Sequence, residues 1–131
     1  ASVEEISKLN ILNASLLSMQ RALIKLKFKP SVAFIDGPFA PKNVSMKCKT
    51  FIKGDEKITC IAAASIIAKT SRDLFMIRLA KKFPGYGWHM NFGYGTSKHL
   101  YGLKKYGITP HHRKKFKPVH NILINTTRET P

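Results

Sequence analysis

Two aspartates stand inside apolar segments of a chain that has few other acids, and they restrict its possible folds more than any other residues. Asp36 ends the apolar run 32–35, and Asp73 lies within the long apolar stretch 61–80. An ionised carboxylate beside a hydrophobic core is costly unless a partner compensates its charge. The chain has seven Asp and Glu against 23 Lys and Arg. We therefore expect both aspartates to be half-buried, next to a basic side chain or a divalent cation.

The overall charge indicates a polyanionic partner. The 131 residues are enough for one domain with its own core, and 44% of them are hydrophobic. A formal net charge of +16 is typical of a protein that binds nucleic acid. The longest apolar run, 58–68, is shorter than the roughly 20 residues of a membrane span. No basic amphipathic segment carries aromatic residues on its apolar face, so we expect no membrane partner.

The cysteines and the first residues predict the compartment. Cys48 and Cys60 lack the spacing of a metal site and have no histidines clustered around them, so we expect two free thiols in a reducing cytosol. Residues 1–5 are short, polar and acidic, unlike the start of a signal peptide. Together these features predict a cytoplasmic protein.

The spacing of apolar residues and the turn signals predict a mixed α/β organisation. Apolar positions that step by three and four predict a helix over 3–27, and Ser2 with Glu5 forms a capping box at its start. A buried strand over 32–35 runs into an Asp-Gly-Pro turn. The other predicted elements are a short strand over 49–52, helices over 59–82 and 96–107, loops over 38–47 and 84–95, a basic irregular segment over 110–117 and a C-terminal tail over 120–131.

Each aspartate allows a structural and a functional interpretation. Asp36 precedes Gly37, and Asp-Gly is a common turn dipeptide, but open α/β sheets also bind ligands at the ends of their strands. Asp73 follows Lys69 by four residues, which is the spacing of a helical ion pair. Either residue alone favours the structural interpretation. The pair together predicts a catalytic site for Mg²⁺ or Mn²⁺ that hydrolyses phosphodiesters, with both aspartates as metal ligands.

The basic residues and one tyrosine predict where nucleic acid binds. A single lysine usually lies on a solvated face, but so many cations cannot all be neutralised internally, and phosphate contact explains the ensemble better. Tyr94 lies between Gly93 and Gly95, which would expose its ring to a sugar or base, whereas the other aromatic residues of this loop are expected in the core. The remaining candidates for nucleic-acid contact are Lys53, Lys69, His99, His112, Arg113, Lys114 and Lys115.

Several ordered motifs of the chain resemble one family. Residues 1–119 are similar to bacterial type 2 ribonuclease H, also called ribonuclease HII. The motifs that carry the resemblance are 34–37 (Phe-Ile-Asp-Gly), 53–55 (Lys-Gly-Asp), 61–73 (Ile-Ala-Ala-Ala-Ser-Ile-Ile-Ala-Lys-Thr-Ser-Arg-Asp), 84–88 (Pro-Gly-Tyr-Gly-Trp), 93–96 (Gly-Tyr-Gly-Thr) and 111–113 (His-His-Arg). Long motifs in this order are poorly explained by chance.

The resemblance implies a ribonuclease H-like fold, in which helices flank a mixed sheet. It also implies an endonuclease, monomeric in the intact family, that cleaves RNA in RNA–DNA hybrids and single ribonucleotides embedded in duplex DNA. The family uses four acidic residues with Mg²⁺ or Mn²⁺. Its third and fourth acids correspond to Asp36 and Asp73, and its junction-sensing tyrosine corresponds to Tyr94.

One part of the family pattern has no counterpart in this sequence. The family's first two acids form an Asp-Glu pair on the first strand, followed by a Gly-Arg-Gly loop that reads the ribose 2′-hydroxyl. Asp55-Glu56 is followed by Lys57 and belongs to another motif. We therefore expect a ribonuclease HII domain without its N-terminal strands, with an incomplete metal site and little activity alone. The alternatives are an inert fragment of this fold and a non-catalytic, basic RNA-binding module of ribosomal-protein type.

Overall fold

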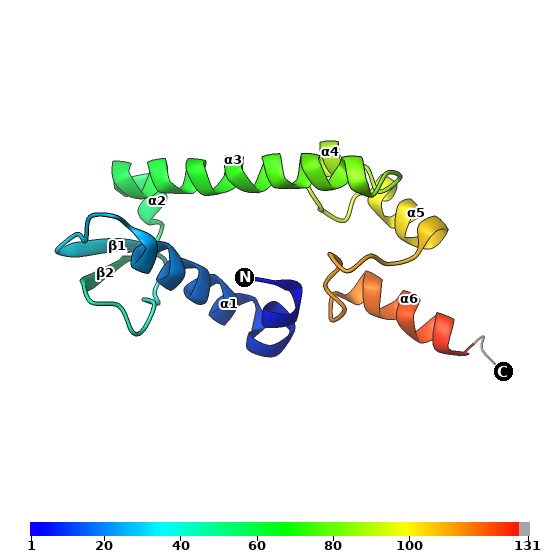
Figure 1. Ribbon diagram of the computed structural model, residues 1–131, viewed down its shortest axis with the longest axis horizontal. Coiled ribbons are helices and arrows are strands. Elements are labelled where there is room, and N and C mark those ends of the chain that lie inside the picture. The colour runs from blue at the N-terminus through cyan, green and yellow to red at the C-terminus, as the bar shows by residue number, and fades with distance from the viewer. Residues whose placement is uncertain (129–131) are drawn as a thin grey trace. The chain divides into compact units, whose positions relative to one another are not determined.

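The computed structural model describes residues 1–128, which form two compact units (Figure 1). The N-terminal unit is Ala1–Ala68, and the C-terminal unit begins at Lys69. The elements are, in order, α1 (Val3–Lys25), β1 (Val32–Asp36), β2 (Lys47–Phe51), α2 (Gly54–Lys57), α3 (Thr59–Lys82), α4 (Trp88–Asn91), α5 (Ser97–Tyr106) and α6 (Lys117–Arg128). Among the described residues, no helix has the length and apolarity required to cross a bilayer.

Helix α1 begins with the predicted capping box. The Ser2 backbone N–H donates to Glu5 Oε2 at 2.8 Å, and the Glu5 backbone N–H donates to Ser2 Oγ at 3.2 Å. Arg21 also donates two hydrogen bonds to the Glu5 carboxylate, at 2.6 and 3.0 Å. The hydrogen bond from Arg21, followed by the one from the Ser2 backbone, lowers the pKa of Glu5 to about 2.

The middle and end of α1 differ from the prediction of a continuous helix over 3–27. Asn10 has φ 68° and ψ 170°, which breaks the helix into two segments. Its Oδ1 accepts the Asn13 backbone N–H at 3.0 Å, so Asn10 acts as an N-cap for the second segment. This combination of φ and ψ is one that residues other than glycine rarely adopt. The helix then ends at Lys25, two residues earlier than predicted.

The two strands form a small parallel sheet in the N-terminal unit, in register from Val32 opposite Lys47 to Asp36 opposite Phe51. Strand β2 therefore begins two residues before its predicted start. In β1, only alternate side chains are buried, including Ala33 and Ile35. The prediction of a buried strand is correct for this face only, because the other face of β1 is exposed.

The buried face of the sheet packs against α1. Ala33, Ile35 and Met46 form a small core, and Met19 and Leu23 of α1 pack against it. The second face carries Phe34, which is 39% exposed and makes an edge-to-face contact with Phe51 at a centroid distance of 5.2 Å. The N-terminal unit is thus an α/β arrangement with one covered sheet face.

The C-terminal unit has a larger core with an aromatic centre. Its buried residues are Met76, Leu79, Tyr86, Trp88, Leu103 and Val119. The predicted helix over 59–82 is confirmed as α3, and Thr96 caps α5 by accepting the His99 backbone N–H. Three helices were not predicted: α2 of the N-terminal unit, α4, a single turn inside the expected loop 84–95, and α6. The predicted boundary at residue 120 falls inside α6.

Candidate functional site

Asp36 is held at the end of β1 by the first turn of α2. The Gly54 backbone N–H donates to Asp36 Oδ1 at 2.8 Å. A glycine at position 54 lets the turn pack closely, since an added Cβ would lie 2.7 Å from Ile61 Cδ1 and 3.2 Å from Phe51 Cβ. Lys53 precedes this turn in a left-handed conformation, with φ 53°. The residue Asp36 is exposed, contrary to the expectation of half-burial, because it lies on the uncovered face of β1.

Asp73 lies on α3 and forms the predicted ion pair with Lys69. Lys69 Nζ donates to Asp73 Oδ2 at 2.5 Å, and the Asp73 side chain is half-buried, with 23% of its surface exposed. The hydrogen bond to Asp73, and then the charge of that carboxylate, raise the pKa of Lys69. Lys69 Nζ also lies 5.6 Å from the centre of the Phe92 ring. The lysine therefore connects the carboxylate with the loop that follows α4.

Tyr94 has a fixed backbone and an exposed ring. Its N–H donates to the Asn91 carbonyl at 2.8 Å, and its own carbonyl accepts from the Thr96 N–H and from His99 Nδ1, each at 2.9 Å. The residue is nevertheless 69% exposed, as predicted from its flanking glycines. The Tyr94 side chain lies near enough to Lys69 to be the weakest of the influences that raise the pKa of that lysine. The C-terminal unit thus brings Asp73, Lys69 and Tyr94 to one site.

The buried side chain of Asn91 organises the loop that carries Tyr94. Its Nδ2 donates to the Tyr86 carbonyl at 2.8 Å and to Thr96 Oγ1 at 3.2 Å, while its Oδ1 accepts the Gly93 N–H at 3.0 Å. Gly93 has φ 86°, and a Cβ there would lie 3.1 Å from the Met76 methyl group. The sequence analysis missed Asn91, because its three partners are recognisable only once the loop is folded.

His99 and His112, which were predicted to contact nucleic acid, are interior residues. Each is 5% exposed, and their Nε2 atoms lie 3.1 Å apart. Trp88 Nε1 donates to His99 Nε2 at 3.2 Å. Burial, followed by the electrostatic effect of the neighbouring His99, lowers the pKa of His112 to about 4. Both histidines are therefore poorly placed for direct phosphate contact, and the site includes them as support beneath the Tyr94 loop.

The other predicted basic contacts are exposed. Lys53 has 68% of its side chain exposed and lies 3.5 Å from Glu56. Arg113 lies over the Phe116 ring at 5.3 Å, and Lys114 and Lys115 follow it on the surface. Their exposure fits phosphate contact, which positions a duplex without reading its sequence.

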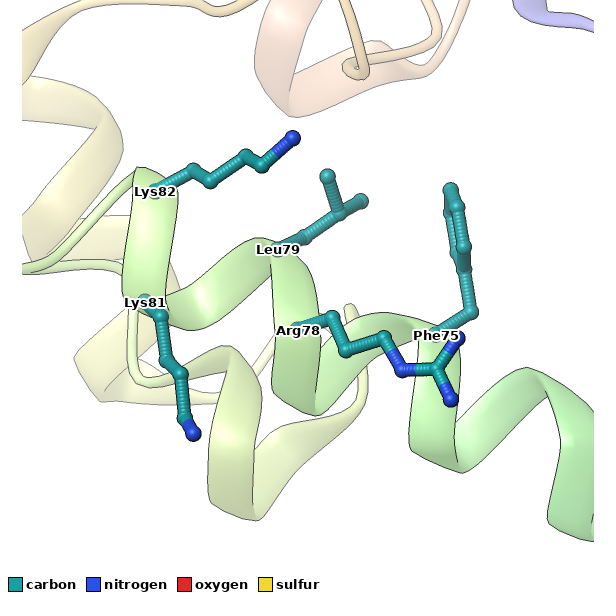
Figure 2. Close-up of a pocket in the computed structure, with 5 residues that line it drawn as sticks. All are labelled: Phe75, Arg78, Leu79, Lys81 and Lys82. Carbon is teal, nitrogen blue, oxygen red and sulfur yellow. The ribbon is translucent and has the colours of Figure 1, made fainter.

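A shallow depression on α3 adds basic residues that the sequence analysis did not select. It has a volume of about 440 Å³ and is lined by Phe75, Arg78, Leu79, Lys81 and Lys82 (Figure 2). The three cationic side chains all come from helix α3. Of the two apolar lining residues, Phe75 is 53% exposed. The sequence held one signal for this cluster of cations. Positions 78, 81 and 82 are spaced by three and four residues, so they share one face of a helix.

The structure does not bring three potential metal ligands together. Within residues 1–128, no group of three or more His, Cys, Asp or Glu side chains is arranged to hold a metal ion. Asp36 belongs to the N-terminal unit and Asp73 to the C-terminal unit. Each supplies carboxylate oxygens, the ligand type that Mg²⁺ and Mn²⁺ prefer. Cys48 and Cys60 are free thiols, as predicted.

Comparisons with known proteins identify the family. A sequence model described as Ribonuclease HII matches residues 1–119. Ribonuclease HII of Cereibacter sphaeroides is 53% identical over 131 residues, the whole of this chain and 62% of that protein. Ribonuclease HII of Pelagibacter ubique is 54% identical over 123 residues, which are 94% of this chain and 66% of that protein. The chain thus spans less than two thirds of the length of these relatives. The α/β fold with its small parallel sheet is consistent with the ribonuclease H-like fold. The chain belongs to the ribonuclease HII family.

Proposed function

We propose that this chain supplies part of a metal-dependent endonuclease that cleaves RNA in RNA–DNA hybrids and single ribonucleotides embedded in duplex DNA. The observation that carries the proposal is the joint placement of Asp73, Lys69 and Tyr94 in a chain of the ribonuclease HII family. A carboxylate, a cation and an exposed aromatic ring are the groups required to hold a metal, a phosphate and a sugar or base.

Asp36 and Asp73 would hold the divalent cations. Oδ1 of Asp36 accepts the Gly54 N–H, which orients its carboxylate before any metal binds. Oδ2 of Asp73 accepts a hydrogen bond from Lys69, so the ammonium group of Lys69 orients this carboxylate. A bound Mg²⁺ or Mn²⁺ supplies Lewis acidity and an activated water to phosphodiester hydrolysis. Both aspartates fit that role chemically, although two carboxylates are fewer than the four that the family uses.

Other residues of the chain would bind and orient the duplex. Lys69 contributes positive charge beside Asp73, and the exposed Tyr94 ring offers a face for the sugar or base at an RNA–DNA junction. Lys53, Arg113, Lys114 and Lys115 would contact phosphates. The affinity of these contacts should fall steeply with salt, with a slope of about −0.9 in log K per log salt for each contacted phosphate.

A binding measurement separates this proposal from that of a basic RNA-binding module, which the net charge of +16 also favours. Titration of Mn²⁺ into the chain, followed by electron paramagnetic resonance, should reveal binding that decreases in Asp36→Asn and again in Asp36→Asn with Asp73→Asn. The matched control is Asp55→Asn, since Asp55 is exposed and caps only the neighbouring Glu56 N–H. Equal Mn²⁺ uptake by all four proteins would favour the RNA-binding module.

A cleavage assay tests the reaction itself. The 131-residue chain alone should cut a duplex with one ribonucleotide weakly or not at all, because the sequence has no counterpart of the family's first Asp-Glu pair. Addition of a segment with the pattern Asp-Glu-x-Gly-Arg-Gly, in cis or as a peptide, should restore Mn²⁺-dependent cleavage. If the chain alone cut the duplex robustly and Asp36→Asn abolished this cutting, the family's first Asp-Glu pair would not be essential for cleavage.

A further inference from the structure

We propose that His99 is a positioning residue for Tyr94, and that the hydrogen-bonded His99–His112 pair forms a clamp beneath the Tyr94 loop. The inference rests on the proposed function only in so far as Tyr94 contacts nucleic acid. The clamp itself follows from hydrogen bonds within the C-terminal unit, and it assigns to these two histidines a role that differs from phosphate binding.

The partners of each histidine fix its tautomer. The Thr109 backbone N–H donates to His112 Nδ1 at 2.9 Å, so this nitrogen carries no proton, and a neutral His112 carries its proton on Nε2. The Tyr94 carbonyl can only accept, so His99 Nδ1 must carry the proton that it donates at 2.9 Å. His99 Nε2 is then the acceptor. It faces two donors, the Trp88 indole N–H and the His112 Nε2–H.

The result is a directed chain of hydrogen bonds that ends at the Tyr94 backbone. His112 donates to His99, and His99 donates to the Tyr94 carbonyl. The Thr96 N–H supports the same carbonyl, and the Asn91 carbonyl supports the Tyr94 N–H. A ligand that meets the Tyr94 ring then need not order this part of the backbone. The interior of the unit thus fixes the backbone from which the Tyr94 ring projects.

The clamp has no place for an additional proton. A proton on His112 Nδ1 would oppose the Thr109 N–H, and a proton on His99 Nε2 would oppose the N–H groups of both Trp88 and His112. The titratable neighbours of the pair are Tyr86, whose ring centre lies 5.1 Å from that of His112, and His111, whose charge disfavours protonation of His112. Acid should therefore weaken the clamp beneath the Tyr94 loop as it charges His112.

Two substitutions of His99 separate positioning from folding. His99→Asn places an amide N–H near the former Nδ1, so the bond to the Tyr94 carbonyl can persist while Trp88 and His112 lose their acceptor. His99→Gln places an amide oxygen near the former Nε2, so Trp88 and His112 keep an acceptor while Tyr94 loses its donor. The control is His89→Gln, because His89 is exposed on α4.

The experiment records the carbonyl ¹³C chemical shift of Tyr94 by NMR in the chain alone. The affinity ratio between a duplex with one ribonucleotide and an all-DNA duplex is measured on the chain joined to the Asp-Glu-x-Gly-Arg-Gly segment, which supplies the loop that reads the 2′-hydroxyl. We expect His99→Gln to move the shift and to reduce the ratio about 2- to 10-fold, as for the loss of one hydrogen bond. His99→Asn should preserve both and lower the melting temperature. Tyr94→Ala provides the reference in which the contribution of the Tyr94 ring to this affinity ratio is lost completely.

The outcomes distinguish the two proposals. If His99→Gln leaves the Tyr94 carbonyl shift unchanged, the clamp is refuted whatever the duplexes do. If the shift moves but the ratio falls only in Tyr94→Ala, the histidine does not position the ring for binding, and that role is refuted. If Tyr94→Ala itself leaves the ratio unchanged, the proposed role of Tyr94 fails, while the carbonyl shift still decides whether the clamp exists. His89→Gln should match the unsubstituted chain in both measurements.

Discussion

The two units of the chain reach order by different means. In the C-terminal unit, six buried residues, Trp88 among them, form the core, and a network of Asn91, His99 and His112 satisfies the polar groups beneath the site loop. In the N-terminal unit, the core beneath the sheet has three buried residues, and one sheet face is exposed. The Tyr94 loop is therefore positioned by the core and the hydrogen-bond network of the C-terminal unit, whereas Asp36 is positioned only by strand β1 and the short helix α2.

The largest expected effect is the loss of Trp88. Trp88→Ala removes a side chain that is 2% exposed and a donor to His99, so we expect a destabilisation of about 3–5 kcal/mol. Tyr101→Ala is the matched control, since Tyr101 is 60% exposed. Hydrogen exchange followed by mass spectrometry should register the loss in the C-terminal unit. An equal loss of protection in β1 and β2 would mean that the two units do not unfold separately, and the comparison would fail.

The next largest expected effect is a loss of stability in mild acid, which should differ between the two units. The pKa of His112 is lowered from 6.5 to about 4, so the unfolded chain binds a proton more readily than the folded one. Its contribution to stability is fully present above about pH 6.5 and is lost as the pH falls towards 4, an effect on the order of 1–3 kcal/mol. Urea denaturation at pH 7.0, 5.5 and 4.5 measures it.

The N-terminal unit should respond to acid at a lower pH. The pKa of Glu5 is lowered to about 2 by Arg21 and the Ser2 backbone, so its contribution is present above about pH 4.5 and is lost only as the pH falls towards 2.

The variant His112→Gln is the control for the response to mild acid, since it should abolish the pH dependence of stability between pH 6.5 and 4. Persistence of that dependence in the variant would assign it to another group.

Two glycines probe how rigid each unit is. A Cβ at Gly102 would lie 2.7 Å from the Gly85 carbonyl oxygen, a backbone atom that cannot rotate away. A Cβ at Gly54 would lie 2.7 Å from Ile61 Cδ1, the end of a side chain that can change rotamer. We therefore expect Gly102→Ala to cost about 1–3 kcal/mol and Gly54→Ala to cost less. Thermal melts followed by circular dichroism test this order, and the reverse order would show that the sheet unit is the stiffer one.

The smallest expected effects concern the two helix caps. Ser2→Ala should cost about 1 kcal/mol, because it removes the acceptor of the Glu5 N–H. Thr96→Ala should cost somewhat more, because Thr96 Oγ1 accepts both the His99 N–H and Asn91 Nδ2. The replacements Ser2→Asp and Thr96→Ser retain a capping oxygen and should restore most of the stability. Equal costs at the two caps would indicate that the bond from Asn91 contributes little.

Features set by local signals were predictable from the sequence. The capping box at Ser2, the helix at 59–82 and the cap at Thr96 all depend on residues within one or two helical turns, and the structure confirms them. The ion pair of Lys69 and Asp73 has the same origin. Family membership was also predictable, because the motifs are contiguous and ordered, and the comparisons confirm it.

Features set by distant contacts were not predictable. His99 and His112 are thirteen residues apart, and only the folded unit shows that they are buried and lie within hydrogen-bond distance of each other. Helix α6 was expected as a tail, but burial of Val119 in the core favours helix there. The break at Asn10 is local but was also missed, because the spacing of apolar residues does not show that the Asn10 side chain caps Asn13 in competition with the helix backbone. The metal site and the roles of the basic residues remain predictions.

The position of the only tryptophan gives the molecule an internal optical label. Trp88 lies in the core of the C-terminal unit, with its indole N–H bonded to His99. Its fluorescence reports on that unit without attached dyes, and a charged imidazole beside the indole would quench it. Stopped-flow mixing into acid or denaturant would therefore time the release of the Tyr94 loop directly, on unmodified protein, while the sheet unit stays optically silent in the tryptophan band.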